Sequence, residues 1–194
     1  MTTTHLLYLH GFRSSPQSMK ARKVAARVAQ EHPQVHWWCP QLPPSPQAAM
    51  AQVMAGIADW PRAHMAVIGS SLGGFYATWV AHQTGCPAVL LNPAVDPARD
   101  LTRYIGEQTS WHNPQDRFFF EPRFVDELRA LDAGPLTHPE RMLAVIAQGD
   151  EVLDWQEMHA RYATTHLKVL PGSDHALSDF DEHIDEVLGF LNLV

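Results

Sequence analysis

Short runs of apolar residues recur along this chain and predict the strands of a buried sheet. They lie at residues 5–9, 35–39, 65–68, 88–91, 142–147 and 167–170. Most of these runs are continuously apolar and lack the alternation of a half-exposed strand, which is typical of a parallel sheet covered on both faces. Between them, apolar residues spaced three or four apart predict amphipathic helices. This alternation predicts a three-layer α/β fold with a doubly wound, mostly parallel sheet of about six strands.

Polar residues mark two helix starts. Ser15 followed by Pro16 predicts that one helix begins there, with the serine as its N-cap. Ser178 stands three residues before Asp181. This spacing is a variant of the capping box and predicts the start of the last helix at Ser178.

Residues 96–138 interrupt the alternation of strands and helices. They are rich in aromatic and turn-forming residues, and we expect two short helices in them, near 97–106 and 122–132. The aromatic candidates for lining a substrate pocket are Trp111, Phe118, Phe119 and Phe120. The three phenylalanines are consecutive, so they cannot all face one core from a helix or a strand. Ordinary packing against the edge of the sheet is the alternative to a substrate pocket.

The length of 194 residues suits one domain that spans 1–194, and the hydrophobic fraction of 45% is ordinary for a globular protein. No apolar run approaches the ~20 residues of a membrane span. The first residues lack the basic and apolar regions of a signal peptide. Cys39 and Cys86 show no metal or redox spacing, so we expect a reduced, cytoplasmic protein.

The net charge of −7 argues against nucleic acid as a partner. Basic side chains nevertheless gather in one short segment, which contains Arg13, Lys20, Arg22, Lys23 and Arg27. They form either a solvated helix face or a docking surface for an anionic part of a substrate, such as the phosphates of a coenzyme A thioester.

The strongest chemical motif is Gly69-Ser70-Ser71-Leu72-Gly73, which has the form G-x-S-x-G. It follows a predicted strand and precedes a helical stretch, as a nucleophile elbow does. The flanking glycines allow a sharp turn and a close approach of backbone segments. The turn projects Ser71 at a helix N-terminus, where developing negative charge is favoured. Ser71 is therefore the candidate nucleophile.

Other segments complete a catalytic pattern. The first predicted strand ends in His10-Gly11-Phe12, a place suited to half of an oxyanion hole. Asp150 and His175 each follow a later predicted strand. The chain order of serine, aspartate and histidine differs from the orders in chymotrypsin and subtilisin, and it is the order of α/β-hydrolases.

With these motifs the chain resembles a small α/β-hydrolase, and more narrowly the YqiA/YcfP-type bacterial esterases. The segments that carry the closer match are 7–12, 40–44, 69–74, 92–95, 149–154 and 174–176. The resemblance implies a minimal α/β-hydrolase fold with a small lid at 96–138, and an esterase with a Ser-Asp-His triad. It does not fix the natural substrate.

In the resulting hypothesis, Ser71 attacks an acyl carbonyl, His175 transfers the proton, and Asp150 orients His175. The backbone N–H groups of Phe12 and Leu72 are the candidate donors of the oxyanion hole. This chemistry requires neither a metal nor an organic cofactor.

Several residues compete for these roles or support them. Asp154 is better explained as the N-cap of the helix that follows it. Asp96 follows the preceding strand, where a minority of α/β-hydrolases keep their acid. Asp174 is interpreted as a residue that shapes its loop, and His10 as a structural support of the oxyanion loop.

The leading hypothesis is a serine esterase that cleaves small-molecule carboxylic esters through an acyl-enzyme. An acyl-CoA thioesterase is the nearest alternative, with the basic segment binding phosphates. A non-catalytic α/β-hydrolase that serves as a binding scaffold is the alternative from another class. The oligomeric state does not follow from the sequence.

Overall fold

A six-stranded sheet organises the fold. The computed structural model describes residues 2–111 and 113–193, so Met1, His112 and Val194 lie outside the described residues. The strands of the sheet are β1 (His5–Leu9), β2 (His36–Trp38), β3 (Met65–Ser70), β4 (Ala88–Leu91), β7 (Met142–Ala147) and β8 (His166–Leu170). Their order is β2-β1-β3-β4-β7-β8, and each neighbouring pair is parallel. The six predicted strands and the α/β fold class are confirmed.

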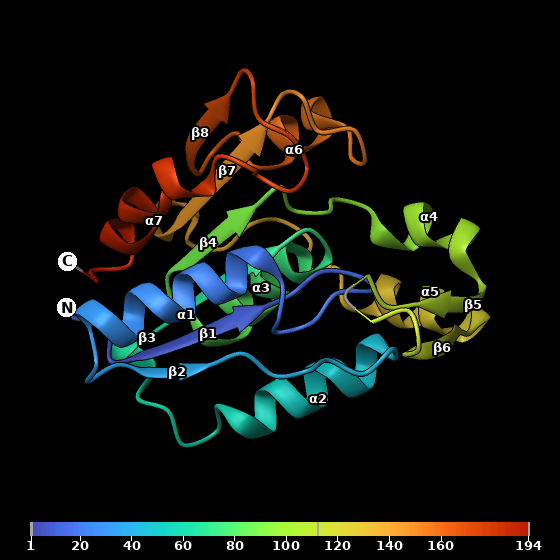
Figure 1. Ribbon diagram of the computed structural model, residues 1–194, viewed down its shortest axis with the longest axis horizontal. Helices are drawn as coiled ribbons and strands as arrows, with labels where there is room; N and C mark the ends of the chain where they lie inside the picture. Colours follow the sequence, from blue (N-terminus) through green and yellow to red (C-terminus); the bar gives the residue numbers. More distant parts are fainter. Residues whose placement is uncertain (1, 112, 194) are drawn as a thin grey trace.

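Helices cover both faces of this sheet (Figure 1). One face carries α1 (Met19–Glu31) and α7 (Ile184–Phe190), and the other carries α2 (Pro46–Gly56), α3 (Leu72–Thr84) and α6 (Trp155–Arg161). Short 3-10 helices are η1 (Arg62–His64), η2 (Thr102–Tyr104), η3 (Pro139–Arg141) and η4 (Phe180–Glu182). Within the described part of the chain, no helix is long and apolar enough to cross a membrane.

Two apolar cores arise because strand side chains point alternately to opposite faces. In β1, Leu7 and Leu9 pack with α2 and α3, whereas Leu6 and Tyr8 pack with α1 and α7. All residues of β3 and β4 are buried. Because helices cover both faces of the sheet, a ligand can reach it only at the ends of the strands. In parallel sheets, ligands bind beyond the carboxyl ends of the strands.

Residues 96–138, here called the cap segment, lie beyond the carboxyl ends of the central strands (Figure 1). The segment contains α4 (Pro97–Leu101), β5 (Gly106–Thr109), β6 (Arg117–Phe120) and α5 (Pro122–Ala130). The two predicted helices are present, the first as α4 followed by η2. The antiparallel pairing of β5 with β6 is not predicted by the sequence, because β5 has no apolar residue from which a period can be read.

Two helix starts differ from the prediction. α1 begins at Met19, and the Ser15 hydroxyl oxygen accepts a hydrogen bond from the Gln17 N–H at 3.1 Å within a turn. Near the C-terminus, the Ser178 hydroxyl donates to Asp174 at 2.7 Å, and η4 precedes α7. In both places the serine side chain bonds within its loop, which competes with capping a helix.

Gly73 marks the close approach of α3 to β1. A Cβ atom at this position would lie 1.9 Å from the carbonyl oxygen of Leu9, which is backbone in a buried strand and cannot rotate away. We expect Gly73→Ala to lower the free energy of unfolding, measured in urea, by about 3 kcal/mol. At Gly172 an added Cβ would meet no atom within 4 Å. Gly172→Ala is therefore the matched control, and equal stability of both variants would contradict this packing.

Candidate active site

Ser71 lies in the turn between β3 and α3 with a strained backbone. Its φ of 56° and ψ of −121° are rare for a residue with a side chain, and such strain costs about 1–3 kcal/mol. The Ser71 N–H donates to the Leu91 carbonyl at 3.0 Å, and the Ser71 carbonyl accepts from the N–H groups of Gly74 and Ala94. These bonds hold the turn. The Ser71 side chain does not cap α3, so the strained turn presents its hydroxyl for other contacts.

The loop after β1 passes beside this serine. A Cβ atom at Gly11 would lie 3.2 Å from the Ser71 Cβ and 3.7 Å from the Ser71 Oγ. The next residue, Phe12, packs its ring against Phe120 with the centroids 5.3 Å apart. Leu72 is the first residue of α3, and the first N–H groups of a helix have no acceptor within it. Phe12 and Leu72 therefore lie on the two segments that flank Ser71.

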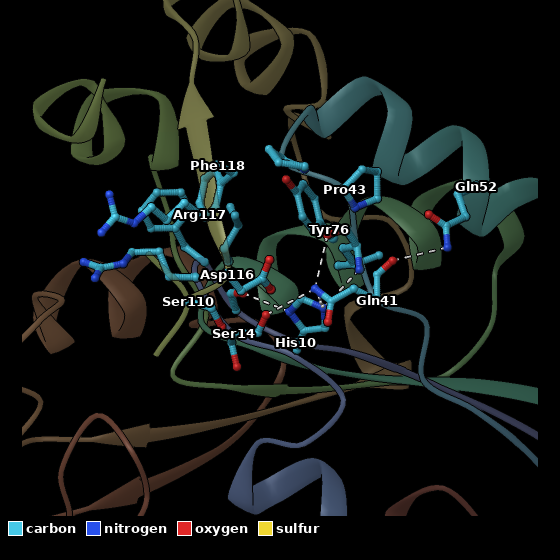
Figure 2. A pocket seen from close by; sticks show the side chains of 16 residues that line it. His10, Ser14, Gln41, Pro43, Gln52, Tyr76, Ser110, Asp116, Arg117 and Phe118 are labelled. Carbon is cyan, nitrogen blue, oxygen red and sulfur yellow. Dashed lines mark hydrogen bonds between the residues drawn. The ribbon is translucent and has the colours of Figure 1, made fainter. Parts of the chain in front are cut away.

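His10 holds the same loop through its imidazole. Its Nε2 accepts a hydrogen bond from the Leu42 N–H at 3.1 Å, which assigns the proton to Nδ1, and Nδ1 lies 3.0 Å from the Gly11 carbonyl oxygen that accepts it. Figure 2 shows His10 beside Gln41 in a cavity of about 470 Å³ that Ser71 does not line. These contacts agree with the structural role expected for His10.

Asp150 and His175 are brought together from two loops at the end of the sheet. The His175 Nδ1 lies 2.7 Å from the Asp150 Oδ2, and the Asp150 side chain is fully buried. The other carboxylate oxygen, Oδ1, accepts from the N–H groups of Val152 and Leu153, both at 2.8 Å. Both oxygens of the Asp150 carboxylate therefore accept hydrogen bonds, and the bond from His175 sets the orientation of the imidazole ring.

Ser71 and His175 line the same two cavities. The structure gives no hydrogen bond between their side chains, although both residues belong to the described part of the chain. Catalytic hydrogen bonds are often long before substrate binds and shorten in the complex. The shared cavities therefore place the hydroxyl and the imidazole where one bound substrate can contact both.

The competing carboxylates are engaged elsewhere. Asp154 caps α6 by accepting from the Gln156 N–H, and Asp96 caps α4 by accepting from the Arg99 N–H. Asp174 accepts two hydrogen bonds from Ser178, which lower the pKa of its carboxyl group. Within residues 2–111 and 113–193, no group of three or more His, Cys, Asp or Glu side chains is placed to hold a metal ion.

Comparison with known proteins places this arrangement in a family. A sequence model of the uncharacterised protein family UPF0227 matches residues 5–192. The chain belongs to UPF0227. This assignment confirms the family resemblance seen in the sequence.

Solved structures similar to this UPF0227 chain share the α/β-hydrolase fold. A candidate hydrolase from Agrobacterium vitis has a TM-score of 0.77 at 17% identity, covering 98% of this chain and 91% of its own. A structure from work on LipS and LipT, metagenome-derived lipolytic enzymes, has 0.74 at 19%, covering 98% and 94%. Est1E from Butyrivibrio proteoclasticus with bound ferulic acid has 0.66 at 14%, covering 98% and 87%. At these identities the likeness establishes the fold.

Asn92 contacts the loop that contains His175, a role that the sequence did not predict. It directly follows β4, is completely buried, and has a left-handed φ of 42°. Its amide nitrogen donates to the carbonyls of Asp174 and His175 at 3.0 and 3.1 Å, and its Oδ1 accepts from the Ala147 N–H at 2.8 Å. Asn92 therefore links the loop that contains Asp174 and His175, here called the histidine loop, to β7. Its place directly after a buried strand, as with Ser71 after β3, is the signal that could have found it.

Asn92→Asp is expected to disturb the histidine loop in this UPF0227 member. Aspartate keeps an acceptor for Ala147 but places a carboxylate against the two carbonyl oxygens that the amide served. We expect the free energy of unfolding at pH 7 to fall by about 3 kcal/mol, measured in urea. Asn113→Asp, at an exposed turn, is the control. Equal unfolding midpoints for the two variants would contradict this role.

Two cavities meet at Ser71 and His175. The larger, of about 430 Å³, has apolar walls that include Leu101 and Leu153, and the smaller, of about 260 Å³, is lined in part by serines. Trp111, a predicted pocket residue, lines both cavities and has 67% of its surface exposed.

The predicted phenylalanines do not line these two cavities. Because they lie on β6, their side chains alternate. Phe120 is buried in the core, Phe119 is 55% exposed, and Phe118 lines the cavity of Figure 2. Phe118 shares its cavity with Phe12 and Leu72, so its assignment to a substrate pocket stays a prediction, whereas Phe119 and Phe120 line neither that cavity nor the two at Ser71. Phe118 and Phe120 pack against Phe12.

Most of the basic segment pairs with other parts of the chain. Lys23 and Arg27 form ion pairs with Asp181 and Asp185. Arg13 donates to the carbonyl and hydroxyl of Thr109 and lies 4.2 Å from the centroid of the Trp111 ring, so it joins the β5–β6 hairpin to the loop after β1. These contacts favour a solvated, paired helix face over a docking surface for phosphates.

Proposed function

We propose that this protein is a serine hydrolase that cleaves carboxylic esters through an acyl-enzyme. The observation that carries the proposal is that His175, which pairs with the buried Asp150, lines a cavity together with Ser71. A serine nucleophile is activated by a nearby base that a third group orients, and this arrangement offers His175 as the base and Asp150 as the orienting group.

In the proposed reaction, the Ser71 oxygen attacks the ester carbonyl while the His175 Nε2 accepts the hydroxyl proton. Collapse of the tetrahedral intermediate breaks the bond to the alcohol oxygen, which takes that proton from His175. Water then attacks the acyl-enzyme and gives a proton to the same nitrogen. The second tetrahedral intermediate collapses as the bond between the acyl carbon and the Ser71 oxygen breaks, that oxygen takes the proton from His175, and the acyl group leaves as the carboxylic acid. Asp150 keeps Nδ1 protonated and stabilises the imidazolium form.

The negative oxygen of the intermediate needs donors on the side of the carbonyl away from His175. The N–H groups of Phe12 and Leu72 are proposed for this role, because their segments flank Ser71 at the start of α3. Each such donor contributes roughly 3 kcal/mol to transition-state stabilisation. The cap segment is proposed to close the apolar cavity over the bound substrate.

The esterase and lipolytic relatives support an ester as the substrate. Pairing of Lys23 and Arg27 with carboxylates weakens the case for a coenzyme A thioester, whose phosphates the basic segment would bind. A non-catalytic scaffold would have no need for a buried carboxylate fixed on both oxygens beside the histidine.

Covalent labelling tests the proposal directly. A fluorophosphonate probe, followed by peptide mass mapping, is expected to give one adduct, on Ser71, in protein that hydrolyses p-nitrophenyl butyrate. The adduct should be absent from His175→Ala and from heat-denatured protein. Folded protein that neither reacts nor hydrolyses the ester would contradict the proposal and favour the binding scaffold.

A further inference from the structure

Lys20 carries a buried ammonium group that the proposed mechanism does not use. The residue is 9% exposed, and its Nζ donates to the carbonyl oxygen of Ala176 at 2.6 Å. An ammonium group has three N–H donors, and among the described residues the other two have no acceptor. By contrast, Lys23 and Arg27 on the same helix each have a carboxylate partner. A buried charge without such a partner is costly, so a group from outside the chain is expected to complete it.

The ammonium group is aimed at the candidate site. Lys20 lines the cavity of about 260 Å³ together with Ser71 and His175. Its partner Ala176 directly follows His175 in the chain and lines the same cavity. Among the described residues that line this cavity, Lys20 is the one lysine or arginine.

We propose that the ester substrate carries a carboxylate, a few bonds from the scissile carbonyl, which binds to Lys20. This inference rests on the proposed function of the same site. A carboxylate fits because one ammonium group matches one negative charge and forms charge-assisted hydrogen bonds with it. A phosphate dianion would be left with an uncompensated charge. The uncharged part of the substrate then occupies the apolar cavity of about 430 Å³.

The charge on Lys20 gives this binding a pH dependence. Burial lowers the pKa of Lys20 to about 8, although Asp174 and Asp150 act in the opposite direction. His10 and His175, which line the same cavity, are the other titratable groups of its lining among the described residues. Lys20 is therefore mostly an ammonium at pH 7 and mostly an uncharged amine well above pH 8. Preference for a carboxylated ester should fall as the pH rises through 8.

Three chromogenic esters test the proposal. Mono-p-nitrophenyl succinate carries the carboxylate on the acid part, 3-butyryloxy-4-nitrobenzoate carries it on the leaving group, and p-nitrophenyl butyrate is neutral. The wild-type protein at pH 7 is expected to prefer one of the carboxylated esters over the neutral ester by roughly tenfold or more in kcat/KM. The preferred ester shows which part of the substrate faces Lys20.

Lys20→Met should abolish this preference, mainly through a higher KM for the carboxylated ester, while activity on p-nitrophenyl butyrate persists. Arg22→Met, which removes an exposed charge from the same helix, should keep the preference. The wild-type preference at pH 7 and pH 9, corrected for spontaneous hydrolysis, is a second measurement that needs no variant.

The outcomes separate this inference from the proposed function. Hydrolysis of the neutral ester without preference for either carboxylated ester would overturn the role of Lys20 and leave the esterase proposal intact. A preference that survives in Lys20→Met, or that is equal at both pH values, would also overturn it. Failure of the wild-type protein to hydrolyse any of the three esters would overturn both.

Discussion

Ser71→Ala is expected to lower kcat/KM for p-nitrophenyl butyrate by roughly 10⁴-fold or more, because it removes the oxygen that is proposed to form the acyl-enzyme. Alanine and serine differ by one oxygen atom, and both experience the same strain at a φ of 56°. The hydrogen bonds that hold this turn use the backbone of residue 71. The variant should therefore unfold at the same urea concentration as the wild type, so that the lost activity reports on chemistry.

Ser70→Ala is the matched control for this prediction. Ser70 is the neighbouring serine, ends β3, and is 7% exposed. Its variant should keep activity within about tenfold of the wild type, because it removes no group from the proposed proton transfer. Wild-type activity in Ser71→Ala, or a loss confined to Ser70→Ala, would move the nucleophile away from Ser71.

The predicted strands were found because burial on both faces leaves a simple pattern. A short, continuous apolar run such as Met65-Ala66-Val67-Ile68, followed by a glycine, is typical of a strand that is buried on both faces. The turn at Ser71 was also predictable from the sequence. The close approach of α3 to β1 requires a glycine at position 73, because a Cβ there would collide with the Leu9 carbonyl oxygen. Sequence therefore predicts those features that short-range sterics and burial dictate.

Some features that depend on contacts between distant segments were not predicted, because no motif accompanies them. Asn92 and Asp174 are 82 residues apart, and no local pattern announces the hydrogen bond between them. In the sequence, Lys20 is one of several charges on a basic helix face, and its burial and its contact with Ala176 distinguish it from Lys23 in the structure. The β5–β6 hairpin was not predicted for a related reason. β5 has no apolar residues, and what defines it as a strand is its hydrogen-bonded pairing with β6.

Asp150→Asn is expected to reduce kcat/KM by roughly 10⁴-fold at pH 7, with little change in stability. The physical reason lies in the two backbone N–H groups, of Val152 and Leu153, that point at the Asp150 Oδ1. They require an oxygen at that position, so the asparagine amide must turn its NH₂ group toward His175. The His175 Nδ1 then has to accept a hydrogen bond, and the ring proton moves to Nε2. A protonated Nε2 cannot take the proton of Ser71.

Matched substitutions decide among the carboxylates that the sequence left in competition. Asparagine caps helices as well as aspartate does, so Asp96→Asn and Asp154→Asn should preserve α4 and α6 and change kcat/KM by less than about tenfold. A large loss in Asp96→Asn with a small loss in Asp150→Asn would reassign the acid. If all three substitutions have small effects, the buried carboxylate beside His175 serves the loop and not the chemistry. The wrong-tautomer argument is specific to residue 150, because in this structure it alone among the three contacts His175.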